Sequence, residues 1–215
     1  MGCDEGSSTV ESVGDIAKSS LYLALQQDDN GQPGGILITS YAQQVLPHVW
    51  IGGYKAYEDV DFLHKNKINA ILSLGHFKDQ YPSGQFIHKI IAVADNPDAN
   101  IVQHFPVAID FIDESLAAGR RILVHCLAGV SRSPTIVSAY IMSKRHIHPK
   151  AALAIIKQQR PFANPNPGFM DQLRLFRDMN YTFDPTHPAY VAYHQNHPLL
   201  SEHAGHEQEY KDVST

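Results

Sequence analysis

The chain has 215 residues, of which 43% are hydrophobic and 18% are charged, values typical of one soluble globular domain with tails. Its formal net charge of −5 argues against a dedicated nucleic-acid binder, which would carry a basic stripe. Only two cysteines occur, Cys3 and Cys126, so no disulfide framework is expected and the cytoplasm or the nucleus is the favoured compartment.

Residues 1–40 are rich in small and polar side chains, and they predict a flexible leader without the features of a signal peptide. Gly2 is available for myristoylation and Cys3 for palmitoylation, which would attach the chain to a lipid surface. A leader without lipid is favoured, because Gly6 stands where the myristoylation motif has Ser or Thr. No apolar stretch in the chain approaches the ~18 residues needed for a membrane span.

Strands and helices are expected to alternate from residue 45 onward. Apolar and β-branched runs predict strands at residues 45–52, 68–74 and 85–93. Helices are expected at residues 53–65 and 103–118, and the second has its apolar side chains on one face and ends at Gly119. Asp95, Asn96 and Pro97 follow the third strand and are typical of a loop.

The centre of the chain combines a strand, a tight loop and a helix start. Residues 122–124 predict a fully buried strand, and residues 125–132 form a loop with one glycine at its centre. A helical run opens at Ser133, where Pro134 is tolerated because a first-turn N–H has no partner to lose. Such an arrangement predicts an anion site, since successive backbone N–H groups converge where the helix dipole is positive.

Two side chains turn this predicted anion site into a candidate reaction centre. Cys126 follows the buried strand, where converging amides favour a thiolate. Arg132 lies six residues later, and its planar guanidinium can hold two oxygens of one phosphate. A nucleophile and a clamp at opposite ends of the loop suit in-line attack on phosphorus. The alternative for Cys126 is an inert buried thiol, and the offsets of Gly129 and Ser133 argue against it.

Two further helices, at residues 149–159 and 169–179, complete an alternating pattern. This pattern predicts an α/β fold with a central, mostly parallel (mixed) sheet of four to five strands and helices on both faces. The domain is expected to span residues 41–182, followed by a disordered tail at 183–215. A zinc site in the tail is not favoured, because the spacing of its histidines is irregular: His187, His194, His197, His203 and His206.

The string HCLAGVSRSPT at residues 125–135 resembles the signature of the cysteine-dependent protein phosphatases, in their dual-specificity branch. AVADNPDANI, HFPVAIDFIDE and RPFANPNPGF resemble family counterparts in the family's order, so the resemblance covers about residues 45 to 179. The chain is identified as a small, atypical member with a protein-tyrosine-phosphatase-like fold. The resemblance implies hydrolysis of phosphotyrosine and phosphoserine or phosphothreonine in proteins, through a phosphocysteine intermediate on Cys126.

The chemistry requires a carboxylic acid that protonates the departing alkoxide or phenoxide. Asp95 and Asp98 both lie in a proline-containing loop upstream of Cys126. Their spacing alone favours neither over the other, nor over an ordinary solvated loop carboxylate. The resemblance implies that Asp95 is the general acid, and then the base when water hydrolyses the intermediate.

Further roles follow for residues in and near the loop. The resemblance implies that Ser133 assists the departing thiolate, with helix capping as an alternative or additional role. His125 is expected to order the loop through a hydrogen bond. Asn166 resembles the family's loop-bracing asparagine, and an Asx turn beside Pro167 is the alternative. The phosphate is expected to be bound by Arg132 and by the N–H groups of Leu127, Ala128, Gly129, Val130 and Ser131.

The expected partner is a phosphoprotein substrate, with no nucleic acid and with neither metal nor cofactor. Phosphoprotein is favoured because the loop between Cys126 and Arg132 has no lysine and no further arginine, unlike the basic loops of phosphoinositide-directed family members. A phosphatase of phosphoinositide, glucan or RNA 5′-phosphate is the first alternative. A non-catalytic phosphate-binding module is the second, and the presence of Cys126, Arg132 and Asp95 argues against it.

Overall fold

The computed structural model describes residues 41–78, 81–82, 84–198 and 200. The expected leader at residues 1–40, with Gly2 and Cys3, lies outside the described residues, as do residues 201–215 of the expected tail. Among the described residues, no helix has both the length and the apolar character required to cross a bilayer.

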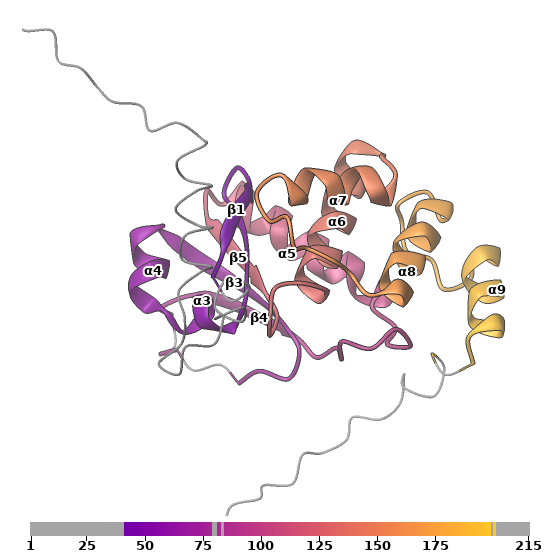
Figure 1. Cartoon of the computed structure of the whole chain (residues 1–215), viewed down its shortest axis with the longest axis horizontal. Helices are drawn as coiled ribbons and strands as arrows, with labels where there is room; N and C mark the ends of the chain where they lie inside the picture. The colour runs from indigo at the N-terminus through magenta and orange to yellow at the C-terminus, as the bar shows by residue number, and fades with distance from the viewer. Residues whose placement is uncertain (1–40, 79–80, 83, 199, 201–215) are drawn as a thin grey trace, which may run out of the picture. The chain divides into compact units, whose positions relative to one another are not determined.

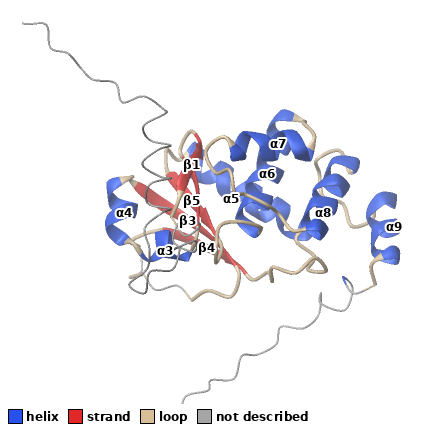
Figure 2. Cartoon of the chain, in the orientation of Figure 1, coloured by secondary structure: helices blue, strands red, loops and turns tan. Residues whose placement is uncertain are grey.

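A five-stranded sheet in the order β1-β2-β5-β3-β4 forms the centre of the structure (Figures 1 and 2). Only the β1–β2 pair is antiparallel, and the other neighbours run parallel, which confirms the predicted α/β class with a mostly parallel sheet. The strands are β1 (Gln43–Leu46), β2 (Val49–Gly52), β3 (Ile68–Leu74), β4 (Ile87–Ile91) and β5 (Arg121–His125).

The predicted single strand at residues 45–52 is a hairpin of β1 and β2. Pro47 has no N–H to give to a ladder, and His48 adopts the left-handed conformation with φ of 64°, so the chain reverses between the two strands. The single-strand prediction is wrong because it passed over Pro47 and His48, which interrupt the apolar pattern and are enough to reverse the chain.

Helices cover both faces of the sheet (Figure 2). On one face lie two short helices, α3 (Tyr54–Glu58) and α4 (Val60–Lys65), over Trp50, Ile71 and Leu123. The opposite face is covered by α5 (Phe105–Ala117), α6 (Arg132–Arg145), α7 (Pro149–Lys157) and α8 (Pro167–Asp178), with the short turn η1 (Val102–His104) before α5.

The expected single helix at residues 53–65 is divided into α3 and α4 at Asp59. The Asp59 carboxylate accepts the N–H of Phe62 at 2.8 Å, so Asp59 is the N-cap of a new helix rather than an interior helical residue. A side chain that bonds to the backbone of the next turn competes with helix continuation, which explains the break.

The prediction that the chain is disordered from residue 183 is wrong for its first part. Residues Pro188–Asn196 form the helix α9, which begins where the His187 ring accepts the N–H of Ala189 at 3.2 Å. Tyr190 and Tyr193 pack against the main core, and Leu200 is also buried. The tail was judged by its polar composition, which does not reveal that two tyrosines on one short helix bind a preformed surface. Across the described residues, no three His, Cys, Asp or Glu side chains gather as a metal site would require.

Candidate active site

The candidate site lies beyond the carboxyl end of β5, which is hydrogen-bonded to β2 on one side and β3 on the other. Residues 126–131 form a loop between β5 and α6, here called the catalytic loop. The helix begins at Arg132, one residue before the predicted start, and Ser131 occupies its N-cap position. The loop therefore lies between a buried strand and a helix N-terminus, as the sequence predicts.

The peptide groups of the catalytic loop have a fixed orientation. Each is trans and planar, so its carbonyl and the following N–H point in opposite directions. The Leu127 carbonyl accepts the N–H of Tyr54 at 2.9 Å, and the Val130 carbonyl accepts the N–H of Asn164 at 2.7 Å. Because these carbonyls are bound outside the loop, the N–H groups that follow them face its interior.

Arg160 fixes the two central peptide groups in the same way. Its guanidinium donates to the carbonyls of Ala128 and Gly129, at 3.1 and 2.7 Å. The result is visible at Gly129, whose N–H donates to the sulfur of Cys126 at 3.2 Å. Gly129 has φ of +67°, and a Cβ there would collide with Arg160, so glycine is required at this position.

Arg160 is fully buried, and the sequence analysis did not single it out. Its guanidinium also donates to the Tyr41 carbonyl at 2.7 Å and lies over the Phe162 ring. Burial lowers the pKa of Arg160 to about 10, so the side chain remains charged at neutral pH. The sequence signal was its place in the family-like string RPFANPNPGF, directly before a proline. That string has no acidic residue with which the arginine could form an ion pair.

Cys126 is almost fully buried at the base of the catalytic loop, with 1% of its surface exposed. Besides the N–H of Gly129, the hydroxyl of Ser133 lies 3.4 Å from its sulfur. Both groups can donate to a thiolate, which they would stabilise. Of the two roles considered for Ser133, helix capping is not observed, because the cap position belongs to Ser131 and Ser133 lies inside the first turn.

Arg132 closes the other end of the loop. Its Nη1 donates to the Val93 carbonyl at 3.2 Å, and its Nε lies 3.7 Å from an oxygen of Asp95. Within the described part of the chain, that buried Nε has no acceptor at hydrogen-bond distance. Gly75, with φ of +136°, leaves room for the guanidinium, since a Cβ there would stand 2.6 Å from Nη1. The side chain is held in place and keeps a donor for an incoming phosphate oxygen.

Of the two candidate acids, the structure brings Asp95 to the catalytic loop. One oxygen of Asp95 accepts the hydroxyl of Ser131 at 2.7 Å and the side-chain amide of Asn166 at 3.0 Å. The carboxylate is about one-third exposed, so it can reach a bound substrate. The backbone N–H of Asp98 donates to the Asn96 side chain at 2.9 Å, and among the described residues its carboxylate has no contact with the catalytic loop.

Asn166 makes the contacts of both roles that were considered for it. Its oxygen accepts the N–H of Phe169 at 2.9 Å and so caps α8, as an Asx turn would. Its amide donates to Asp95, and its own backbone N–H donates to the Ser131 hydroxyl at 3.1 Å. Helix α8 thereby ties the candidate acid to the catalytic loop.

His125 is buried beneath the loop, stacked on the Tyr57 ring at a centroid distance of 4.5 Å. Burial lowers the pKa of His125 to about 3, with the charges of His88 and Arg132 acting in the same direction, so the ring is neutral at physiological pH. Its Nδ1 lies 3.3 Å from the Cys126 carbonyl, which can only accept, so the ring proton is assigned to Nδ1.

The opposite ring nitrogen of His125 therefore accepts a hydrogen bond. It lies 2.6 Å from the hydroxyl of Ser73, which must be the donor. The bond from His125 to the Cys126 carbonyl orients the next peptide group, so that the N–H of Leu127 also faces the interior of the loop. His125 contacts the loop as the sequence analysis expected.

Comparison with known proteins agrees with this geometry. The family model for the dual specificity phosphatase catalytic domain matches residues 49–179. Dual specificity protein phosphatase 22-B of Danio rerio is 43% identical over 134 residues, which are 62% of this chain and 73% of that protein. Dual specificity protein phosphatase 19 of Mus musculus is 35% identical over 133 residues, 62% of this chain and 60% of that protein.

A solved structure shows the same fold. The crystal structure of DUSP15 superposes with a TM-score of 0.61 at 34% identity, and the match covers 76% of this chain and 97% of that one. The chain spans less than two thirds of the mouse relative's length, so the likeness concerns the domain that carries the catalytic loop.

The substitution Arg160→Lys is expected to weaken oxyanion binding. Lysine cannot hold two neighbouring carbonyls at once, and hydrogen bonds to charged groups contribute about 1.5–3 kcal/mol each. We expect the inhibition constant of orthovanadate to rise by roughly 10- to 100-fold. Arg145→Lys, on the exposed end of α6, is the matched control and should leave this constant unchanged. An Arg160→Lys variant that is folded and binds vanadate like the wild type would contradict the bracing role.

His125 is expected to make stability depend on pH. Its pKa is about 3 in the folded chain and near 6.5 when unfolded, so the unfolded state binds one proton more between these values. The unfolding free energy should fall as pH decreases from 6.5 toward 3, by up to about 1.4 kcal/mol per pH unit from this group. Urea unfolding of wild type and His125→Asn at pH 6.5, 5.5 and 4.5 measures the difference. Equal slopes for the two proteins would show that His125 is not held neutral.

Proposed function

This chain belongs to the dual specificity phosphatase family, and we propose that it hydrolyses phosphotyrosine and phosphoserine or phosphothreonine in proteins, with Cys126 as the nucleophile. The observation that carries the proposal is the sulfur of Cys126 at the base of a loop whose carbonyls are bound on the outside. A trigonal set of phosphoryl oxygens is what inward-facing amides and an arginine bind best.

In the first step, the thiolate of Cys126 attacks phosphorus as the bond to the substrate oxygen breaks. The phosphoryl group moves to sulfur, and negative charge on its oxygens is stabilised by the loop amides and by Arg132. The leaving oxygen takes a proton from Asp95, which lies beside the loop on a separate segment. The products are a phosphocysteine and a free hydroxyl or phenol.

In the second step, water attacks the phosphocysteine and gives a proton to Asp95, now a carboxylate. The sulfur leaves as a thiolate, and inorganic phosphate is released. The hydroxyl of Ser133 lies 3.4 Å from the sulfur, so it can donate to the thiolate as the P–S bond breaks. No group outside the described residues is required in either step, because the thiolate, the amides and Arg132 supply the nucleophile and the charge stabilisation.

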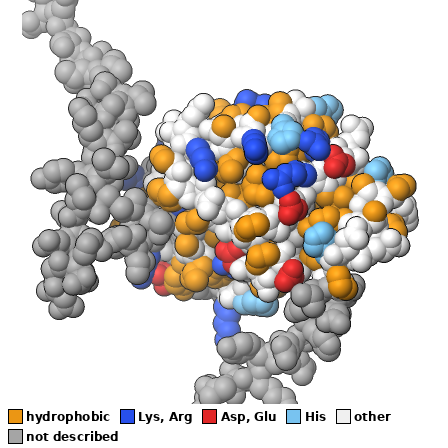
Figure 3. Space-filling view, turned by 45° about the vertical axis from the view of Figure 1, so that its right-hand side comes forward, with side chains coloured by type: hydrophobic (Ala, Val, Ile, Leu, Met, Phe, Trp, Pro, Cys, Tyr) orange, Lys and Arg blue, Asp and Glu red, His pale blue; other side chains and the backbone are white. Residues whose placement is uncertain are grey.

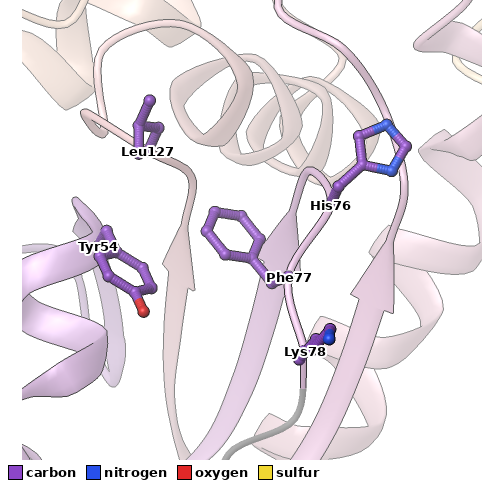
Figure 4. Close-up of a pocket in the computed structure, with 5 residues that line it drawn as sticks. All are labelled: Tyr54, His76, Phe77, Lys78 and Leu127. Carbon is purple, nitrogen blue, oxygen red and sulfur yellow. The ribbon is translucent and has the colours of Figure 1, made fainter. Parts of the chain in front are cut away.

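A protein substrate is supported by a cavity beside the catalytic loop. Its volume is about 350 Å³, and Figure 4 shows the side chains around it: Tyr54, His76, Phe77, Lys78 and Leu127. Leu127 belongs to the catalytic loop and is 63% exposed, so the cavity adjoins the loop that holds the phosphate. Apolar walls with one lysine suit a peptide side chain that flanks the phosphorylated residue.

The charges of the catalytic loop also suit a protein substrate. On the face drawn in Figure 3, most basic side chains gather in the upper half, with acidic and hydrophobic side chains among and below them. The catalytic loop itself has no lysine and no arginine between Cys126 and Arg132, which a site for the more anionic RNA or lipid would have. Location in the cytoplasm or nucleus, and a lipid anchor at Gly2 and Cys3, rest on the sequence alone.

Cys126→Ser is expected to abolish turnover of a phosphotyrosine peptide while binding of that peptide remains. Serine keeps the size of the side chain but is not ionised at neutral pH, so the nucleophile is lost and the oxyanion-binding amides are not. Phosphate release, measured without added metal, should fall below detection, and calorimetry should show peptide affinity within a few-fold of wild type. Near-wild-type turnover would refute the nucleophile, and faster wild-type turnover of a phosphoinositide than of the peptide would refute the substrate class.

Asp95→Asn is expected to lower kcat/KM for phenyl phosphate by about 10²–10⁴-fold, the range that a general acid supplies. The loss in kcat/KM, which reports the transfer to Cys126 and not the later hydrolysis, should be much smaller for an aryl phosphate whose phenol leaves easily, because that oxygen needs little protonation. Asp98→Asn is the matched control, three residues away in the same loop, and should remain close to wild type on both substrates. If the two variants exchanged these behaviours, Asp98 would be the acid.

A further inference from the structure

The segment that carries Asp95, residues 94–101, is here called the acid loop, and neighbouring elements hold it near both of its ends. At its start, Asp95 is bound by Ser131 and Asn166. At its end, Asn100 is buried, and its side-chain amide donates to the hydroxyl of Tyr190 at 3.0 Å. Tyr190 belongs to α9, so the chain beyond the core of the domain reaches the loop of the candidate acid.

The acid loop is short and internally bonded, so its two ends do not move independently. The Asn96 side chain accepts the N–H of Asp98 at 2.9 Å, and the Asn96 carbonyl accepts the N–H of Ala99 at 3.0 Å. The Ala99 carbonyl in turn accepts the side-chain amide of Gln172, in α8, at 2.9 Å. Displacement of the loop at Asn100 therefore changes the position of Asp95, five residues earlier in the chain.

Tyr190 is itself held in a defined position. Its ring lies edge-on to Phe183 at a centroid distance of 5.2 Å and close to the His194 ring at 4.2 Å. The ring nitrogen of His194 lies 3.4 Å from the Asn100 amide, on the same side of the loop. Two side chains of α9, one turn apart, thus converge on one buried amide of the acid loop.

We propose that α9 is a support of the acid loop and that Tyr190 is a positioning residue for Asp95, acting through Asn100. This inference rests on the proposed function, because it assigns a task to α9 in the proton-transfer step. The family model matches residues 49–179, and α9 begins at Pro188. Of the two residues in the Asn100–Tyr190 hydrogen bond, Tyr190 therefore lies outside the matched region.

A contact that positions the acid and a contact that only stabilises the fold have different effects on the reaction rate when they are lost. In the transfer of the phosphoryl group to Cys126, which kcat/KM reports, a misplaced acid slows only substrates whose leaving oxygen needs a proton, whereas a distorted catalytic loop slows every substrate. Loss of the Tyr190 hydroxyl should therefore depend on the leaving group. The thiolate, the loop amides and Arg132 are not contacted by α9 residues in any of the interactions described above.

The test uses the full chain with Tyr190→Phe, which removes the hydroxyl and keeps the ring. We expect kcat/KM for phenyl phosphate, which reports the transfer to Cys126, to fall by roughly tenfold, a part of what a general acid supplies. For an aryl phosphate with an acidic phenol, kcat/KM should change by less than about twofold. Val191→Ala, on the same helix at a position 42% exposed, is the control and should match the wild type on both substrates.

A second variant tests the route of the effect. Asn100→Ala should show the same dependence on the leaving group, and the double variant should be no slower than the slower single one, because both changes break one connection. An equal loss on both substrates, no loss at all, or additive losses in the double variant would overturn the inference. Asp95→Asn in the same assay separates the two proposals: if it alone depends on the leaving group, only the role of α9 fails, and if it does not, the acid assignment fails as well.

Discussion

The outward binding of the catalytic-loop carbonyls is the constraint on which the site depends. A planar trans peptide cannot turn its carbonyl out without turning the next N–H in. Arg160 holds two of these carbonyls, and backbone N–H groups of Tyr54 and Asn164 hold two others. The loop is consequently a set of donors whose direction is fixed before any phosphate arrives, so little reorganisation is needed during reaction.

The same constraint gives each buried polar group near the site a definite task. His125 is neutral and has one proton, and that proton is used on the carbonyl of Cys126. Helix α8 supplies Asn166, which caps its own helix and holds Asp95, and Gln172, which holds the acid loop at Ala99. The nucleophile and the acid are thus carried by separate elements that share supports, which keeps their separation constant.

The sequence predicted the parts of the fold and site that depend on local pattern. The buried strands, the helix after the catalytic loop, Cys126 and Arg132 each have a clear pattern within a few residues. Arg160 was missed because its partners, such as Gly129, lie about thirty residues away and the chain must fold to bring them together. The break at Asp59 and the helix α9 were missed for a related reason, since a hydrogen-bonding cap and a docking surface overrule composition.

The choice between Asp95 and Asp98 shows most clearly what the sequence alone could not predict. The two residues have the same side chain in one loop, and spacing could not separate them, whereas in the structure only Asp95, of these two, binds Ser131 and Asn166. The most direct test of the central claim is a crystal structure of Cys126→Ser with bound phosphate. Backbone nitrogens of residues 127–131 and the Arg132 guanidinium should lie about 2.7–3.2 Å from the phosphate oxygens. A phosphate bound instead by side chains elsewhere, with the loop nitrogens turned away, would contradict the account.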